Sequence, residues 1–251
     1  MTALRASRRT DGAGTWEGHS YGFTKTWSTV TWPEARPVTP GSDVDAYRSL
    51  QSASESRESI SSAFRWTGSF EATDGRETLI GTLTATTSPK PVIAFEGSVS
   101  AESIEHVRAQ LASLLMHRRS TPFAEGDGRS VVKWTGRSDD SGREVSVADR
   151  YGSTYRIKDG TVTEVVRTID GKRLVLQVQS VERLPDGRYL SKRFTSTTSG
   201  PDGAVESQLV YEDRFTAVGN EWLPLERRVT GRSRGRDIKM SVRFSGYKVL
   251  P

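Results

Sequence analysis

Three consecutive residues at the end of a predicted helix, His117, Arg118 and Arg119, are the strongest candidates for chemistry in this chain. A histidine titrates near neutral pH, so His117 could act as a general acid or base while a neighbouring arginine holds an anionic group. Arg118 falls on the apolar face of the helix, and a buried arginine needs carboxylate or carbonyl partners. We therefore expect an internal polar cluster. In the simpler alternative, His117 and Arg118 only tie the helix end to carbonyl groups of nearby strands.

Asp213 is the predicted acidic partner of this helix end. The hydrophobic residues that share its face in an alternating, strand-like stretch are Leu209, Tyr211 and Phe215. A carboxylate on that buried face would be a suitable partner for an arginine such as Arg118. If the protein is an enzyme, its predicted catalytic residues are therefore His117, Arg118 and Asp213.

Residues 1–43 are rich in tryptophan and proline, and we expect them to form an arm outside the main domain. The tryptophans of this arm would either cover an exposed edge of the sheet or embrace a second subunit, or else form a lid over a ligand. An arm that embraces a second subunit would hold a homo-oligomer together. If the arm is a lid over a ligand, the ligand-binding residues would be Trp27, Trp32, Arg119 and Tyr211.

No metal ion or other cofactor is predicted. His106 and His117 lie on one face of the predicted helix but about 16 Å apart along it, too far to bind one ion. The acidic stretches 126–128 and 139–140 lack the ligand spacing of a calcium-binding loop and are expected to be turns. The chain has no cysteine, which excludes thiolate catalysis. It also shows neither a nucleophile elbow nor a glycine-rich phosphate loop.

Five Asp-Gly pairs predict how the strands are arranged. Asp-Gly favours the positive φ angles of tight hairpin turns, so most of these pairs should mark a reversal between two strands. The pairs are Asp74-Gly75, Asp159-Gly160, Asp170-Gly171, Asp186-Gly187 and Asp202-Gly203. The last four indicate one long antiparallel meander, which twist should curl into a half-barrel or open barrel. We expect strands at residues 61–72, 76–87, 91–98, 129–135, 143–149, 153–158, 161–169, 172–184, 188–198, 204–217, 221–230 and 236–249.

Two helices are expected beside this mainly β structure. Ser42 and Asp43 are candidate caps for a short helix over residues 44–53. A longer helix over residues 101–118 would follow Ser100 as its N-cap. Its apolar residues recur with the helical period at Ile104, Val107, Leu111, Leu114 and Leu115. We expect this longer helix to cover the concave side of the sheet.

The composition predicts a single β-rich domain over residues 44–251. Hydrophobic residues make up 34% of the chain, and no stretch approaches the roughly 20 apolar residues that cross a bilayer. The pair Arg8-Arg9 is not followed by the apolar region of an export signal. We therefore expect a cytoplasmic protein.

The formal net charge of +5 arises from the C-terminal part of the chain. The basic residues concentrated there are Arg227, Arg228, Arg232, Arg234, Arg236, Lys239, Arg243 and Lys248. Such a basic strand could bind an acidic protein or an anionic membrane surface. The same alternation of basic and apolar residues is typical of the solvent face of an ordinary strand. Specific recognition of nucleic acid is not expected, because no known recognition motif accompanies it.

Four stretches together resemble a bacterial, chiefly cyanobacterial, family of unknown function over about residues 46–231. They are Met116-His117-Arg118-Arg119 followed by Phe123, Tyr155-Arg156-Ile157-Lys158 running into Val165-Val166-Arg167, Gly187-Arg188-Tyr189-Leu190, and Tyr211-Glu212-Asp213-Arg214-Phe215 leading to Val218-Gly219. The resemblance implies that His117 and Arg118 match the family's helix-end motif, and it implies no activity. The expected shape is also similar to that of half-barrels that carry lipids or lipoproteins.

Three functions are compatible with these observations. The protein could hold an apolar small molecule, such as a lipid, an isoprenoid or a pigment-like compound, on the concave face of the sheet. It could instead be a biosynthetic enzyme of proton-transfer type, a cyclase, isomerase or lyase that uses His117. It could also be an accessory or assembly protein that docks through its basic surface. We favour the first function.

Overall fold

The computed structural model of the protein describes residues 37–86, 90–119 and 121–251. Trp27, Trp32 and most of the predicted arm lie outside these residues, so the roles expected of the arm stay predictions. Residues 39–251 form one compact unit, which is described below.

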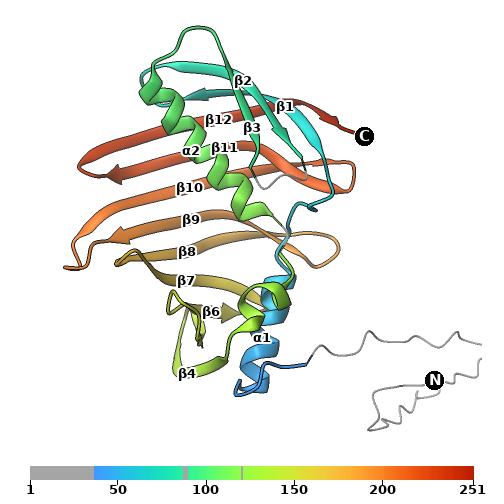
Figure 1. The fold of residues 1–251 in the computed structure, drawn as a ribbon, viewed down its shortest axis with the longest axis vertical. Coiled ribbons are helices and arrows are strands. Elements are labelled where there is room, and N and C mark those ends of the chain that lie inside the picture. Colours follow the sequence, from blue (N-terminus) through green and yellow to red (C-terminus); the bar gives the residue numbers. More distant parts are fainter. Residues whose placement is uncertain (1–36, 87–89, 120) are drawn as a thin grey trace, which may run out of the picture. The chain divides into compact units, whose positions relative to one another are not determined.

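Twelve antiparallel strands form a single sheet in the order β3-β2-β1-β12-β11-β10-β9-β8-β7-β6-β5-β4 (Figure 1). Their bounds are β1 Trp66–Thr73, β2 Thr78–Ala85, β3 Val92–Glu96, β4 Val132–Asp139, β5 Gly142–Val147, β6 Thr154–Lys158, β7 Thr161–Ile169, β8 Lys172–Arg183, β9 Tyr189–Ser199, β10 Val205–Val218, β11 Glu221–Ser233 and β12 Arg236–Val249. The predicted meander is confirmed from β4 to β12. Because β3 and β4 are the two edges and do not pair with each other, the sheet is open.

The Asp-Gly pairs lie at the predicted reversals. All five fall between consecutive strands that pair with each other. At residues 159–160 and 170–171 both members have positive φ angles, 48° and 67° in the first pair and 50° and 76° in the second. These are the angles of the tight turn whose twist matches that of the flanking strands.

Pairing of β1 with β12 adds the N-terminal hairpins to the far end of the meander. Phe70 of β1 lies opposite Phe244 of β12, and both side chains are buried. The chain must then cross the whole sheet, from β3 at one edge to β4 at the other. The helix α2 (Ala101–Arg118) makes most of this crossing and lies over one face of the sheet, as predicted (Figure 1).

The core lies between α2 and the strands on which the helix packs. Buried residues on both sides include Val107, Leu111 and Leu114 of the helix and Phe70, Leu83, Leu223, Val229, Met240 and Val242 of the sheet. The backbone N–H of Ser103 donates to Ser100 Oγ at 3.3 Å, so the predicted N-cap of α2 is confirmed. None of the described helices is long and apolar enough to cross a membrane.

The helix α1 (Val44–Glu55) begins as predicted but is not capped as predicted. The side chain of Asp43 accepts a hydrogen bond from Trp134 N at 3.0 Å, and Ser42 Oγ accepts one from Val132 N at 2.9 Å. Both donors belong to the edge strand β4, whose outward N–H groups have no neighbouring strand and need acceptors. The two side chains therefore cover a sheet edge instead of capping the helix.

Candidate functional site

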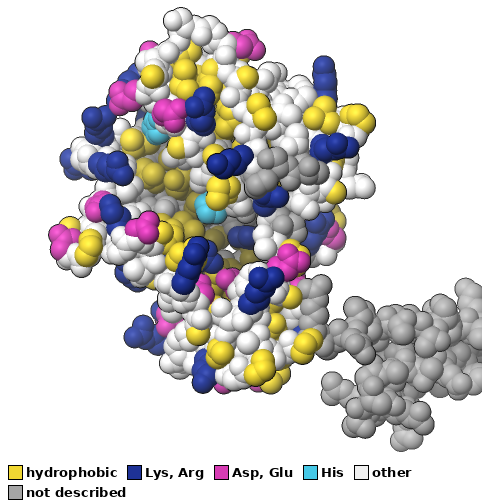
Figure 2. Space-filling view, viewed as in Figure 1, with side chains coloured by type: hydrophobic (Ala, Val, Ile, Leu, Met, Phe, Trp, Pro, Cys, Tyr) yellow, Lys and Arg dark blue, Asp and Glu magenta, His cyan; other side chains and the backbone are white. Residues whose placement is uncertain are grey.

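A pocket of about 110 Å³ lies beside the end of α2. Its apolar wall consists of Leu114 from α2, Val162 and Val165 from β7, Leu176 and Val178 from β8, and Tyr189 and Phe194 from β9. Its polar lining consists of Arg57, Glu58, His117, Arg118, Ser191, Asp213 and Arg227. Figure 2 shows a hollow on this face of the molecule, with hydrophobic side chains in its depth and charged side chains around it. The three predicted catalytic residues are thus brought together in one pocket.

Arg118 is buried, with 7% of its surface exposed, as its place on the apolar face of α2 predicts. Its Nη2 donates to the carbonyl oxygen of Trp222 at 2.8 Å, and its guanidinium lies 4.5 Å from the ring centroid of Phe215. Burial lowers the pKa of Arg118 to about 10, with the charge of Glu58 acting in the opposite direction. The group therefore stays charged at neutral pH. Its Nε has no hydrogen-bond partner among the described residues.

Asp213 pairs with Arg227 and not with Arg118. Nε and Nη2 of Arg227 donate to the two carboxylate oxygens at 2.7 and 2.6 Å, and both side chains are buried. The guanidinium also lies 5.1 Å from the ring centroid of Tyr211, which stacks on Phe194 at 4.7 Å. The assignment of Arg227 to an exposed basic surface is therefore wrong. Its register position opposite Asp213 places it on the covered face of the sheet.

Glu58 is a member of the site that the sequence did not indicate. Its side chain is fully buried and forms an ion pair with Arg188, while its Oε1 accepts no hydrogen bond from the described residues. Burial raises the pKa of Glu58 above its usual 4.5, although the charges of Arg188 and Arg118 oppose this. Glu58 lies in an irregular segment between α1 and β1, where no periodicity distinguishes a buried position from an exposed one.

His117 lies at the rim of the pocket and is exposed. Protein atoms still crowd its imidazole, and this desolvation, followed by the charges of Arg227, Arg57 and Arg167, lowers the pKa of His117 below 6.5. The neutral form of the imidazole therefore predominates at pH 7. Within the described part of the chain His117 forms no hydrogen bond with Asp213, whose two oxygens accept from Arg227.

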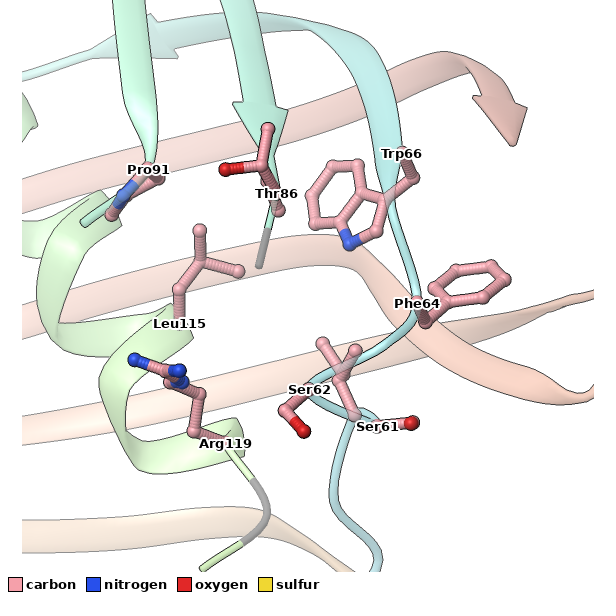
Figure 3. Close-up of a pocket in the computed structure, with 10 residues that line it drawn as sticks. Ser61, Ser62, Phe64, Trp66, Thr86, Pro91, Leu115 and Arg119 are labelled. Carbon is pink, nitrogen blue, oxygen red and sulfur yellow. The ribbon is translucent and has the colours of Figure 1, made fainter. Parts of the chain in front are cut away.

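The two predicted ligand-binding residues that the structure describes lie outside this pocket. Tyr211 does not line the pocket, but its ring stacks on that of Phe194, which does. Arg119 lines a separate space of about 40 Å³ beside Leu115 and Trp66 (Figure 3). That volume is enough for one or two water molecules. Arg119 is therefore separated from the larger pocket although it follows Arg118 directly.

Part of the predicted basic surface is neutralised by ion pairs. The carboxylate of Glu226 lies 2.9 Å from Arg228, 3.5 Å from Arg214 and 3.7 Å from Arg243. Arg236 pairs with Glu102 of α2 at 2.9 Å. Residues 37–86, 90–119 and 121–251 contain no group of three His, Asp or Glu side chains that could hold a metal ion.

Comparison with solved structures finds weak likenesses. The LolA superfamily protein NE2245 from Nitrosomonas europaea is 12% identical, with a TM-score of 0.35 over 82% of this chain and 94% of that chain. One chain in the complex structure of Pseudomonas aeruginosa MucA/MucB is 12% identical, with a TM-score of 0.23 over 82% of this chain and 94% of that chain.

No curated protein matches the chain. A family model does match, over residues 42–250, which extends beyond both ends of the stretch that the sequence motifs indicated. The chain therefore belongs to the family described as "Protein of unknown function (DUF3386)".

Proposed function

We propose that the protein binds an apolar small molecule on the concave face of its sheet, in the pocket beside the end of α2. The observation that carries this proposal is a stretch of apolar sheet face, on β7 and β8 beside the end of α2, whose side chains are only half-buried. Ligand sites are typically concave, mostly apolar and furnished with a few polar groups. The pocket has this composition, and the ligand classes that fit it are lipids, isoprenoids and pigment-like compounds.

One row of side chains runs from the covered core into the pocket. Residues that lie directly opposite each other on neighbouring strands share a face of the sheet, and the row from β8 to β12 is Val178, Phe194, Tyr211, Val229 and Met240. Its last three members are buried in the core beneath α2. The first two line the pocket. The pocket is thus a continuation of the core at the end of α2.

The helix α1 packs on the other side of these pocket residues. α1 packs against β4, β6 and β7, whereas the core beneath α2 involves β1, β2 and β10 to β12. Where these two regions meet, the apolar side chains of β7 and β8 are only half-buried, namely Val162, Val165, Leu176 and Val178. Covering such side chains with an apolar ligand would be favourable, by roughly 25 cal/mol for each Å² removed from water.

The size of the pocket limits what it holds. A cavity of about 150 Å³ in a protein core accepts a benzene molecule, and the pocket has about 110 Å³. It therefore accommodates a small apolar group or one end of a longer molecule. A longer ligand would leave its remainder outside the pocket.

Titration with the neutral apolar fluorophore N-phenyl-1-naphthylamine tests this proposal. We expect saturable binding at one site per chain, with a blue-shifted emission that decan-1-ol reverses by competition. Native mass spectrometry of the purified protein would show a co-purifying ligand directly. If the fluorophore does not bind saturably and no ligand co-purifies, the proposal is wrong.

A further inference from the structure

We infer that the ligand is an amphiphile with an anionic end, a carboxylate or phosphate, which the guanidinium groups of Arg57, Arg118 and Arg227 bind inside the pocket. This inference rests on the proposed function and adds the chemistry of the ligand's polar end. Three observations carry it: buried donors without acceptors, an exposed arginine without an ion pair, and the charge balance of the pocket.

Arg227 contributes a buried donor. The side chain is 2% exposed, and its Nε and Nη2 are used by Asp213. Its Nη1 is also buried and has no hydrogen-bond partner among the described residues. A buried donor without an acceptor is costly. Because Arg227 lines the pocket, an anionic oxygen bound there would supply the acceptor that Nη1 lacks.

Arg118 contributes a second buried donor from the opposite side, on α2. One of its terminal nitrogens donates to the Trp222 carbonyl. Its Nε is buried and has no partner within the described residues. Arg118 and Arg227 both line the pocket, so one ligand anion with two or three oxygens could accept from both. Arginine forms its strongest hydrogen bonds with such anionic oxygens.

Arg57 provides an exposed cation at the same pocket. It lines the pocket beside Glu58 and forms no ion pair with the described residues. Its backbone is held in place by a parallel bridge to Tyr189 of β9. An exposed arginine at a pocket entrance can attract an anion and then form part of its binding site.

The charge balance of the lining favours an anion over a cation. Each pocket carboxylate already has an arginine partner, because Asp213 pairs with Arg227 and Glu58 pairs with Arg188. The charges of Arg57 and Arg118 are then left without a paired carboxylate among the residues described. The apolar wall of β7, β8 and β9 continues from this cationic end. A ligand with an anionic group and an apolar chain complements both parts.

Isothermal titration calorimetry with decanoate and decan-1-ol tests the inference, because the two probes share one apolar chain and differ in charge. We expect the full-length protein to bind decanoate at least about tenfold more tightly than decan-1-ol, since hydrogen bonds to charged groups are the stronger ones. Arg57→Gln and Arg118→Gln should each weaken decanoate binding by about tenfold and weaken decan-1-ol binding much less. Arg173→Gln, at an exposed arginine of β8 outside the pocket, is the matched control.

The possible results separate this inference from the proposed function. Equal affinities for decanoate and decan-1-ol would overturn the inference and leave the proposed function intact. Failure of both probes to bind would contradict the proposed function as well. Decanoate binding that survives both Arg57→Gln and Arg118→Gln would refute the assignment to these residues. Acetate that binds as tightly as decanoate would show an anion site with no need for an apolar chain. Decyl phosphate, compared with decanoate, tells which anionic end is preferred.

Discussion

Asp213 and Arg227 face each other across β10 and β11, joined by two hydrogen bonds of 2.7 and 2.6 Å on the covered face of the sheet. The pair lines the pocket, with the rings of Tyr211 and Phe194 beside its guanidinium. It therefore holds an ionised arginine at the pocket in a fixed orientation. Such a pair specifies geometry more than it adds stability, because desolvation offsets much of its attraction.

Replacing one partner of this pair should be far worse than replacing both. Arg227→Met leaves the Asp213 carboxylate buried and unpaired, and we expect a loss of about 3–5 kcal/mol in the free energy of unfolding. The double variant Arg227→Met/Asp213→Leu should lose clearly less, because no charge is left behind. Urea unfolding of both variants measures the difference. A double variant as unstable as the single one would contradict this account of the pair.

Asp74 links the first Asp-Gly turn to the start of α2, and its removal should be costly. Its Oδ1 accepts from the backbone N–H groups of Arg76 and Glu77 at 3.0 and 3.1 Å, and its Oδ2 accepts from Ser103 Oγ at 2.6 Å. We expect Asp74→Ala to lose about 1–2 kcal/mol of unfolding free energy. Asp202→Ala, at another Asp-Gly turn, is the matched control. Among the described residues, that side chain accepts a single hydrogen bond, from Ala204 N within its own turn, so its loss should be smaller.

The stability that the Asp74 side chain contributes should decrease in acid. Desolvation favours the neutral form of Asp74, but the hydrogen bonds from Ser103, Glu77 and Arg76 outweigh it and lower the pKa below 3.8. A lowered pKa stabilises the folded state above the unfolded-state pKa, and this contribution is lost as the pH falls through the folded-state value. The difference between the wild type and Asp74→Ala should therefore shrink below about pH 4. A difference that grows on acidification would refute this.

Local signals in the sequence predicted much of the fold, and the part they missed depends on distant pairing. Asp-Gly turns and the helical period act over a few residues, which is why the meander and α2 could be located. The pairing of Trp66 with Val249 joins the first strand to the last. No turn or spacing encodes such a contact, so the place of β1 in the sheet could not be derived. The partner of Asp213 was missed for the same reason, since it depends on the register of β10 and β11.

The site was predictable where a polar residue interrupts an apolar face. Arg118 and Asp213 both break an otherwise hydrophobic pattern, and both line the pocket. Arg57 and Glu58 lie in an irregular segment without any such pattern, so their place at the site emerges only from the tertiary structure. Arg119 was predicted to bind the ligand but does not line the pocket. One step of about 100° around the helix from Arg118 places it beside the smaller, separate space.

His117 should make the protein less stable in mild acid. Its lowered folded-state pKa means that, below 6.5, the unfolded chain binds the proton more readily than the folded protein does. The wild type should therefore lose stability relative to His117→Gln as the pH falls from about 8 to about 5.5. Taking the difference between the two proteins cancels the contribution of Glu58, whose raised pKa has the opposite sign. Parallel urea titrations that show no change in this difference would contradict the lowered pKa.

Filling the pocket from its apolar wall should abolish ligand binding without unfolding the protein. Val165 of β7 lies opposite Leu176 of β8, and both line the pocket, so the indole of Val165→Trp would occupy the space that a ligand needs. Val175→Trp is the matched control, because Val175 precedes Leu176 and points to the other face of the sheet. We expect Val165→Trp to weaken binding of N-phenyl-1-naphthylamine by more than about tenfold, and Val175→Trp to leave it unchanged. Equal effects of the two substitutions would place the ligand elsewhere. Thermal unfolding of both variants shows whether a loss of binding reflects a blocked pocket or a damaged fold.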